Sequence, residues 1–134
     1  MAWQSPSELT PDSTIVLNGV KVNICLIKNH NINNVQLPTK RTNKFKGVVI
    51  HNTNRAYSAD DGRQYTAATL NNNVATRTNF YVTELGALQN LEETDMNWSC
   101  GDGTKGQGNN GCISLEIIMN SKNKSEDLKA RVNG

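Results

Sequence analysis

The chain has 134 residues, a net charge of +2 and a low mean hydropathy of −0.58. This length fits one domain with one modest core, and the weak charge gives no reason to expect a nucleic-acid partner. No apolar run approaches the ~18 residues of a membrane span, so we expect no membrane partner either.

The first elements in the chain predict an arm followed by a β-hairpin. Residues 1–13 carry prolines and small polar side chains, which are typical of a flexible arm, and they show no secretory signal peptide. Residues 14–17 and 20–27 flank Asn18-Gly19, a pair that tight hairpin turns favour. We therefore place the domain itself at residues 14–134.

A polar segment, residues 28–46, contains a basic cluster. The pattern predicts a solvated loop, with contact to an anionic polymer as the alternative. The cluster comprises Lys40, Arg41, Lys44 and Lys46. His30 lies in the same segment, and we expect it to be a surface residue.

The segment from Gly47 to Thr53 predicts a short, fully buried strand, because it contains Val48-Val49-Ile50. His51 stands where this apolar run ends. Imidazole is a common metal ligand and titrates near neutral pH, so His51 is a candidate ligand or base.

Three elements are expected after this strand. Ser58 and Asp60 favour a helix that runs to about residue 73, and residues 79–83 with 87–91 predict a second hairpin. Residues 92–112 are expected to be irregular.

A glycine cluster, Gly101 to Gly106, matches the dinucleotide-binding pattern G-x-G-x-x-G. That fingerprint needs a strand before it and a helix after it, whereas we expect a loop before and a strand after. We therefore reject a nucleotide site. Instead, these glycines predict a loop that folds tightly against a site.

Residues Ile113 to Met119 predict another buried strand, with Glu116 inside it. Burial disfavours an ionised carboxylate and raises its pKa toward the range of a general acid or base. Read alone, His51 and Glu116 could each be merely satisfied polar residues of a sheet.

The cysteines are Cys25, Cys100 and Cys112, and this small odd number favours free thiols over a disulfide framework. Because Cys100 and Cys112 bracket the glycine cluster, a pairing between them stays open. Residues 124–134 begin like a capped helix with an apolar stripe, so we expect a domain cut short at its C-terminus.

Several motifs together resemble one known family. The motifs are Val49-Ile50-His51-Asn52-Thr53, Asn79-Phe80-Tyr81-Val82-Thr83, Trp98-Ser99-Cys100-Gly101-Asp102-Gly103, Gly108-Asn109 and Ile113-Ser114-Leu115-Glu116-Ile117. In this order they look like the zinc-dependent N-acetylmuramoyl-L-alanine amidases of the amidase-2 type, which share their fold with T7 lysozyme and the peptidoglycan recognition proteins. The closest likeness is to phage endolysins. The resemblance implies an α/β (α+β) domain with a central mixed sheet flanked by helices, here lacking the C-terminal helix region.

The resemblance also assigns roles to residues. It implies that His51 is a zinc ligand, that Glu116 is the catalytic acid or base, and that Asn79 and Trp98 line the substrate cleft. Some relatives carry a catalytic Tyr where this chain has Thr78.

The remaining family ligands, a His and a Cys or Asp, are expected further along than residue 134. His30, Cys100 and Cys112 are the other residues of ligand type in this chain, and His51, Cys100 and Cys112 form a possible local set.

The implied activity is hydrolysis of the amide between N-acetylmuramic acid and L-alanine in peptidoglycan, with Zn²⁺ as cofactor and the muramyl peptide as partner. We expect synthesis in the cytoplasm and action on the bacterial cell wall, with this chain alone inactive. The alternative is a non-catalytic peptidoglycan-binding relative.

Overall fold

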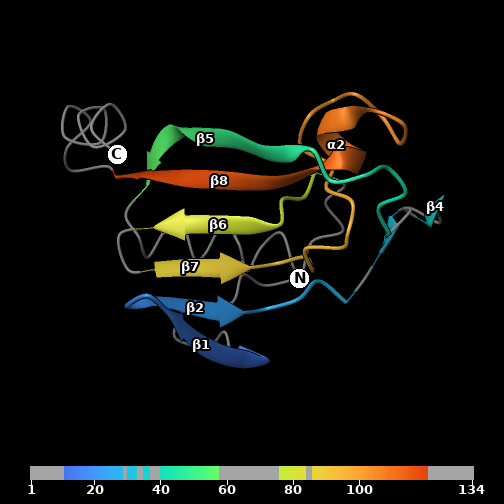
Figure 1. Cartoon of the computed structure of the whole chain (residues 1–134). Coiled ribbons are helices and arrows are strands. Elements are labelled where there is room, and N and C mark those ends of the chain that lie inside the picture. The colour runs from blue at the N-terminus through green and yellow to red at the C-terminus, as the bar shows by residue number, and fades with distance from the viewer. Residues whose placement is uncertain are drawn as a thin grey trace.

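A computed structural model describes residues 11–28, 30–32, 35–36, 40–57, 76–83 and 86–120. The main element is a six-stranded mixed sheet with the order β1-β2-β7-β6-β8-β5 (Figure 1). Its strands are β1 (Ser13–Leu17), β2 (Val20–Ile24), β5 (Gly47–Tyr57), β6 (Phe80–Thr83), β7 (Gly86–Gln89) and β8 (Cys112–Asn120). One short helix, α2 (Gln107–Gly111), leads directly into β8. An α/β domain built on a mixed sheet is therefore confirmed.

Both predicted hairpins are present. Strands β1 and β2 are antiparallel, and Asn18 and Gly19 between them adopt φ angles of 49° and 81°, as a tight type I′ turn requires. Strands β6 and β7 form the second antiparallel pair. The predicted helix at residues 58–73, the C-terminal segment 124–134 and most of the N-terminal arm lie outside the described residues.

The strand after Gly47 is confirmed, but its predicted full burial is wrong. Strand β5 is at the edge of the sheet and pairs only with β8 among the described strands. Val48 and Ile50 point to the same side and are 51% and 63% exposed. An apolar run is equally typical of a central and an edge strand, so the sequence did not distinguish them.

The core lies on the opposite side of the sheet from Val48 and Ile50. A buried cluster joins Cys25, Tyr81, Leu88 and Ile118. Tyr81 on β6 is in register with Glu116 on β8, and Ile118 lies two residues further along β8 on the same face. The face that carries Glu116 is therefore continuous with the core.

The polar segment before β5 is more ordered than expected. It contains a two-stranded hairpin of β3 (Asn31–Ile32) and β4 (Val35–Gln36), and Lys40 forms a bridge with Asp95. His30 is half-buried rather than a surface residue, and the Nη1 atom of Arg77 donates to its Nδ1 atom at 3.0 Å. No helix in the described part of the chain is long and apolar enough to cross a membrane.

Candidate functional site

His51 and Glu116 lie side by side across two neighbouring parallel strands. The pairing of β5 with β8 places His51 directly opposite Glu116. Residues in register on adjacent strands point to the same face of a sheet, because side chains alternate with a period of two along each strand. The register of β5 and β8 then breaks between Asn52 and Ala56, just beyond this pair.

The surroundings of Glu116 suit a proton acceptor. Its side chain is half-buried, and burial raises the pKa of the carboxyl above its ordinary value, although the nearby His51 partly lowers it. A carboxyl whose pKa lies closer to neutral both accepts and returns a proton more readily.

The thiol of Cys100 is a third reactive group and lies beside His51. Its Sγ atom lies 3.8 Å from the Nε2 atom of His51. Burial is the main cause that raises the pKa of the thiol above its ordinary value. All three cysteines are free, as the sequence favoured, so Cys100 is not paired with Cys112.

Two buried asparagines hold the turn that carries Cys100. The Oδ1 atom of Asn109 accepts from the backbone N–H of Ser99 at 3.1 Å and of Cys100 at 2.9 Å. The Nδ2 atom of Asn97 donates to the carbonyls of Gly108 at 2.9 Å and Cys112 at 3.0 Å. Asn97 and Asn109 are 0% and 1% exposed. Sequence reasoning quoted Asn109 only as part of a motif and missed Asn97.

The glycine cluster forms a loop whose residues 101–105 are exposed, and a short helix follows it. The carboxylate of Asp102 accepts from the N–H groups of Gly108 at 2.7 Å and Asn109 at 3.1 Å, at the start of α2. A side chain of the protein thus fills the position where a nucleotide phosphate would bind. The rejection of a dinucleotide site stands, although the expectation that a strand follows directly was wrong.

The hydroxyl group of Ser114, on the same strand as Glu116, contacts two other hydroxyl groups. The Oγ atom of Ser114 lies 2.7 Å from that of Ser99 and 2.6 Å from Oγ1 of Thr78. Ser114 is two residues before Glu116 and shares its face of β8. These hydroxyls fix the strand that carries the acid.

Comparisons with known proteins find similar proteins both by sequence and by fold. The N-acetylmuramoyl-L-alanine amidase CwlH of Bacillus subtilis (strain 168) is 30% identical over 74 residues, which are 55% of this chain and 30% of CwlH. The structure of PlyL matches with a TM-score of 0.58 at 25% identity, over 84% of this chain and 69% of PlyL. A mutant endolysin from Bacillus subtilis matches with a TM-score of 0.56 at 26% identity, over 75% of this chain and 63% of that protein. No protein-family model matches.

Over part of its length, the chain is similar to an N-acetylmuramoyl-L-alanine amidase in sequence and to an endolysin in fold. It spans less than a third of the length of the curated amidase that it matches. The resemblance drawn from the motifs is thus supported independently by sequence and by fold.

The other two predicted site residues, Asn79 and Trp98, are both at least half-buried. Asn79 is fully buried, and its amide donates to the carbonyl of Glu92 at 3.0 Å and accepts from the N–H of Ser114 at 2.9 Å. Trp98 is half-buried, and its backbone pairs with that of Arg77. Asn79 therefore anchors β8, and a contact of either residue with substrate stays a prediction.

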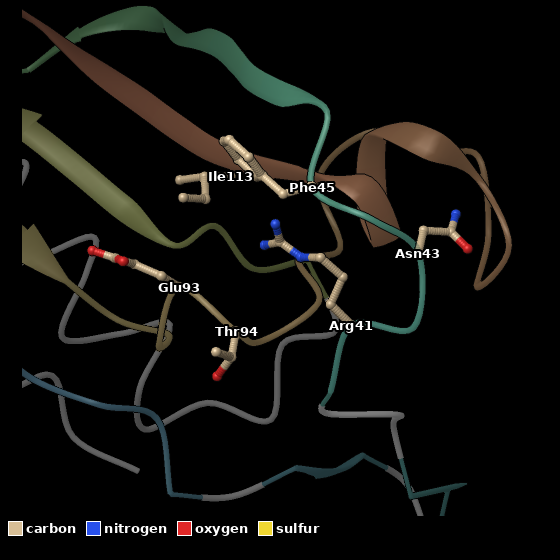
Figure 2. Close-up of a pocket in the computed structure, with 6 residues that line it drawn as sticks. All are labelled: Arg41, Asn43, Phe45, Glu93, Thr94 and Ile113. Atoms are coloured by element: carbon tan, nitrogen blue, oxygen red, sulfur yellow. The ribbon is translucent and has the colours of Figure 1, made fainter.

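Figure 2 shows the residues that line a cavity of about 410 Å³. Its lining residues are Arg41, Asn43, Phe45, Glu93, Thr94 and Ile113. Ile113 is three residues before Glu116 on β8, so it points to the opposite face of the sheet. The cavity is therefore not part of the candidate active site.

The donor groups at the site fit a zinc ion in part. Imidazole and thiol are ligands that zinc prefers, and His51 and Cys100 supply one of each at close range. The part of the chain described by the structure contains no group of three or more His, Cys, Asp and Glu side chains arranged to hold a metal.

Proposed function

We propose that this chain belongs to a zinc-dependent enzyme that hydrolyses the amide between N-acetylmuramic acid and L-alanine in peptidoglycan. The observation that carries the proposal is the register of His51 with Glu116 on one face of β5 and β8. The amidase named among the relatives and the fold of the matched endolysin support the choice of this bond. The site of action is then the bacterial cell wall.

In this proposal His51 holds the metal and Glu116 moves the proton. A zinc ion held there would supply Lewis-acid chemistry toward the scissile carbonyl. Glu116 takes a proton from the attacking water as this water adds to the carbonyl carbon. The same carboxyl then gives the proton to the nitrogen of L-alanine as the C–N bond breaks, so the peptide leaves as a neutral amine.

The rigidity of the site supports the assignment. Asn79 fixes the backbone of β8 through Ser114, and the hydroxyls of Thr78 and Ser99 hold the Ser114 side chain. A general base is effective only when it is held close to its target geometry, and these bonds limit movement of the strand two residues from Glu116.

The test is an analysis of the new ends that the protein creates in purified peptidoglycan. An amidase of this kind releases peptides with a free L-alanine N-terminus and creates no new reducing sugar ends. New reducing ends would instead indicate cleavage of the glycan chain, and new amines on other residues would indicate a peptidase. Binding to the wall without any new end would favour a non-catalytic peptidoglycan-binding protein.

A further inference from the structure

Arg41 is a cation that forms no ion pair within the described part of the chain. Figure 2 shows its guanidinium reaching into the space between Phe45, Ile113 and Glu93. We propose that this cavity is a binding site for a small ligand that combines a carboxylate with an apolar group. The cavity is not part of the candidate active site, so the inference does not rest on the proposed function.

Lys40, rather than Arg41, pairs with the acidic side chains of this region. Its Nζ atom donates to the carboxylate of Asp95 at 2.6 Å and to that of Glu92 at 3.0 Å. Asp95 contacts Arg41 through its backbone carbonyl, which accepts from the Nη2 atom at 3.1 Å. A carbonyl carries no net charge, so the positive charge of Arg41 is available to an anionic ligand.

The guanidinium of Arg41 also has an unused donor. Its Nε atom is buried and has no hydrogen-bond partner among the described residues. Buried polar atoms in proteins nearly always have a partner, so an unpaired one indicates that a further group completes the bonding. A carboxylate suits this position, because guanidinium and carboxylate form two parallel hydrogen bonds.

The protein positions Arg41 before a ligand arrives. The backbone N–H of Arg41 donates to the carbonyl of Thr94 at 3.0 Å. The central carbon of the guanidinium lies 5.8 Å from the centre of the Phe45 ring, within the range of a cation–π interaction. A side chain that is already held loses little freedom on binding, and this favours affinity.

The rest of the cavity suits an apolar group of modest size. Phe45 is 58% exposed, and the partly exposed side chain of Ile113 also lines the cavity. The volume of about 410 Å³ falls near the lower end of the range of about 300–1,000 Å³ that is usual for small-ligand sites. The carboxylate of Glu93 is exposed and points away from Arg41 in Figure 2, so water weakens its repulsion of an anion.

The probe for this site is 3-phenylpropanoate, and its matched control is the neutral 3-phenylpropanamide. In amide NMR spectra of the purified chain, the acid should shift the signals of Phe45, Thr94 and Ile113 and reach saturation with a Kd of about 1 mM or below. The neutral compound should bind at least about tenfold more weakly, because it lacks the bonds between opposite charges. Equal affinities, or no saturation by about 10 mM acid, would overturn the inference.

Two variants test whether Arg41 supplies the charge. Arg41→Gln should weaken binding of 3-phenylpropanoate by at least about tenfold. Lys44→Gln removes the same charge from an exposed residue that is not part of the cavity lining, and it should change the affinity by less than about twofold. Equal losses in the two variants would indicate general attraction to basic side chains and would overturn the site.

Circular dichroism establishes that each variant is folded. If Arg41→Gln does not fold, Arg41→Lys replaces it, because Lys keeps the charge but cannot form the two parallel bonds. It should bind the acid more weakly than the unchanged chain does, and equal binding would overturn the role of the guanidinium. The comparison of acid and amide in the unchanged chain needs no variant.

A free carboxylic acid and the C-terminal residue of a peptide share the proposed chemistry. The tripeptide Gly-Gly-Phe and its C-terminal amide distinguish these sources in the same NMR titration. Tighter binding of the tripeptide than of 3-phenylpropanoate would identify a peptide end as the ligand, and weaker binding would identify a free acid. In both cases the amide must bind more weakly than the acid, and failure of this order in both pairs would exclude a carboxylate site.

Discussion

His51 and Glu116 are directly opposite each other in the parallel pairing of β5 and β8. This register determines that an imidazole and a half-buried carboxyl share one face of the sheet. A shift of one residue would send one of the two side chains to the other face. Glu116 is thus the residue on which the proposed proton transfers depend.

Replacement of Glu116 by Gln tests that role. Gln keeps the shape of the side chain but cannot accept a proton, so the rate of peptidoglycan hydrolysis should fall by about 10²–10⁴-fold. Metal binding and the thermal unfolding midpoint should stay close to those of the unchanged chain. The matched control is Glu93→Gln, at an exposed residue that lines the cavity (Figure 2). Full activity in Glu116→Gln would contradict the mechanism.

A variant at Asn109 tests the scaffold of the Cys100 turn. Asn109→Ala leaves the backbone N–H of Cys100 without its acceptor, whereas the N–H of Ser99 keeps the Oδ1 atom of Asn97 at 3.2 Å. An unsatisfied buried group costs about 1–3 kcal/mol, so the free energy of unfolding should fall by about 1–3 kcal/mol in a urea titration.

The control for this loss is Asn43→Ala, which removes an amide whose bond to the carbonyl of Lys105 is exposed. It should cost no more than about 0.5 kcal/mol, as is usual for surface substitutions. Equal losses in the two variants would show that the Cys100 turn does not depend on Asn109.

His30 should make stability depend on pH. Burial and the charge of Arg77 hold the pKa of His30 below its ordinary value of 6.5, and Arg77 donates to Nδ1, which must therefore be unprotonated. The unfolded chain binds this proton more readily than the folded chain does. The stabilisation is present above pH ~6.5 and should be lost as the pH falls from there toward the folded pKa.

The measurement is the free energy of unfolding at several pH values between about 5 and 8, where an unperturbed His titrates. In His30→Gln the side chain still accepts from Arg77 but does not titrate, so the curve should be flatter over this interval. An identical pH dependence in the two proteins would exclude His30 as its source.

Strand β5 allows a test of the exposed face of the sheet. Ile50 is 63% exposed, whereas Leu88 is 3% exposed in the core cluster. Ile50→Thr should change the free energy of unfolding by less than about 0.5 kcal/mol. Leu88→Ala should lower it by about 2–5 kcal/mol. A large loss in Ile50→Thr would mean that this face is covered in solution.

Local sequence signals predicted the elements that depend on local chemistry. Asn18-Gly19 is sufficient to define the first hairpin, because few other residues tolerate positive φ angles. The apolar runs around His51 and Glu116 likewise predicted their strands. The proximity of these two residues came from the family resemblance, since no local pattern states which strands pair.

Other features depend on contacts between distant parts of the chain and could not be read locally. Cys100 lies beside His51 because the side-chain amides of two buried asparagines, Asn97 and Asn109, hydrogen-bond to the turn that carries it. Similarly, the sequence predicted a surface position for His30, because its hydrogen bond with Arg77 joins residues that are far apart in the chain. Polar residues such as Asn give no periodic signal, so no local pattern predicted the buried hydrogen bonds that they form.

Side-chain amides and backbone groups hold the turn that carries Cys100, and among the described residues the Asp102 carboxylate is its charged support. Dissolved ions screen attraction between charged side chains but have little effect on bonds between neutral amides. The spacing of the thiol and the imidazole should consequently be the same in dilute buffer and in brine.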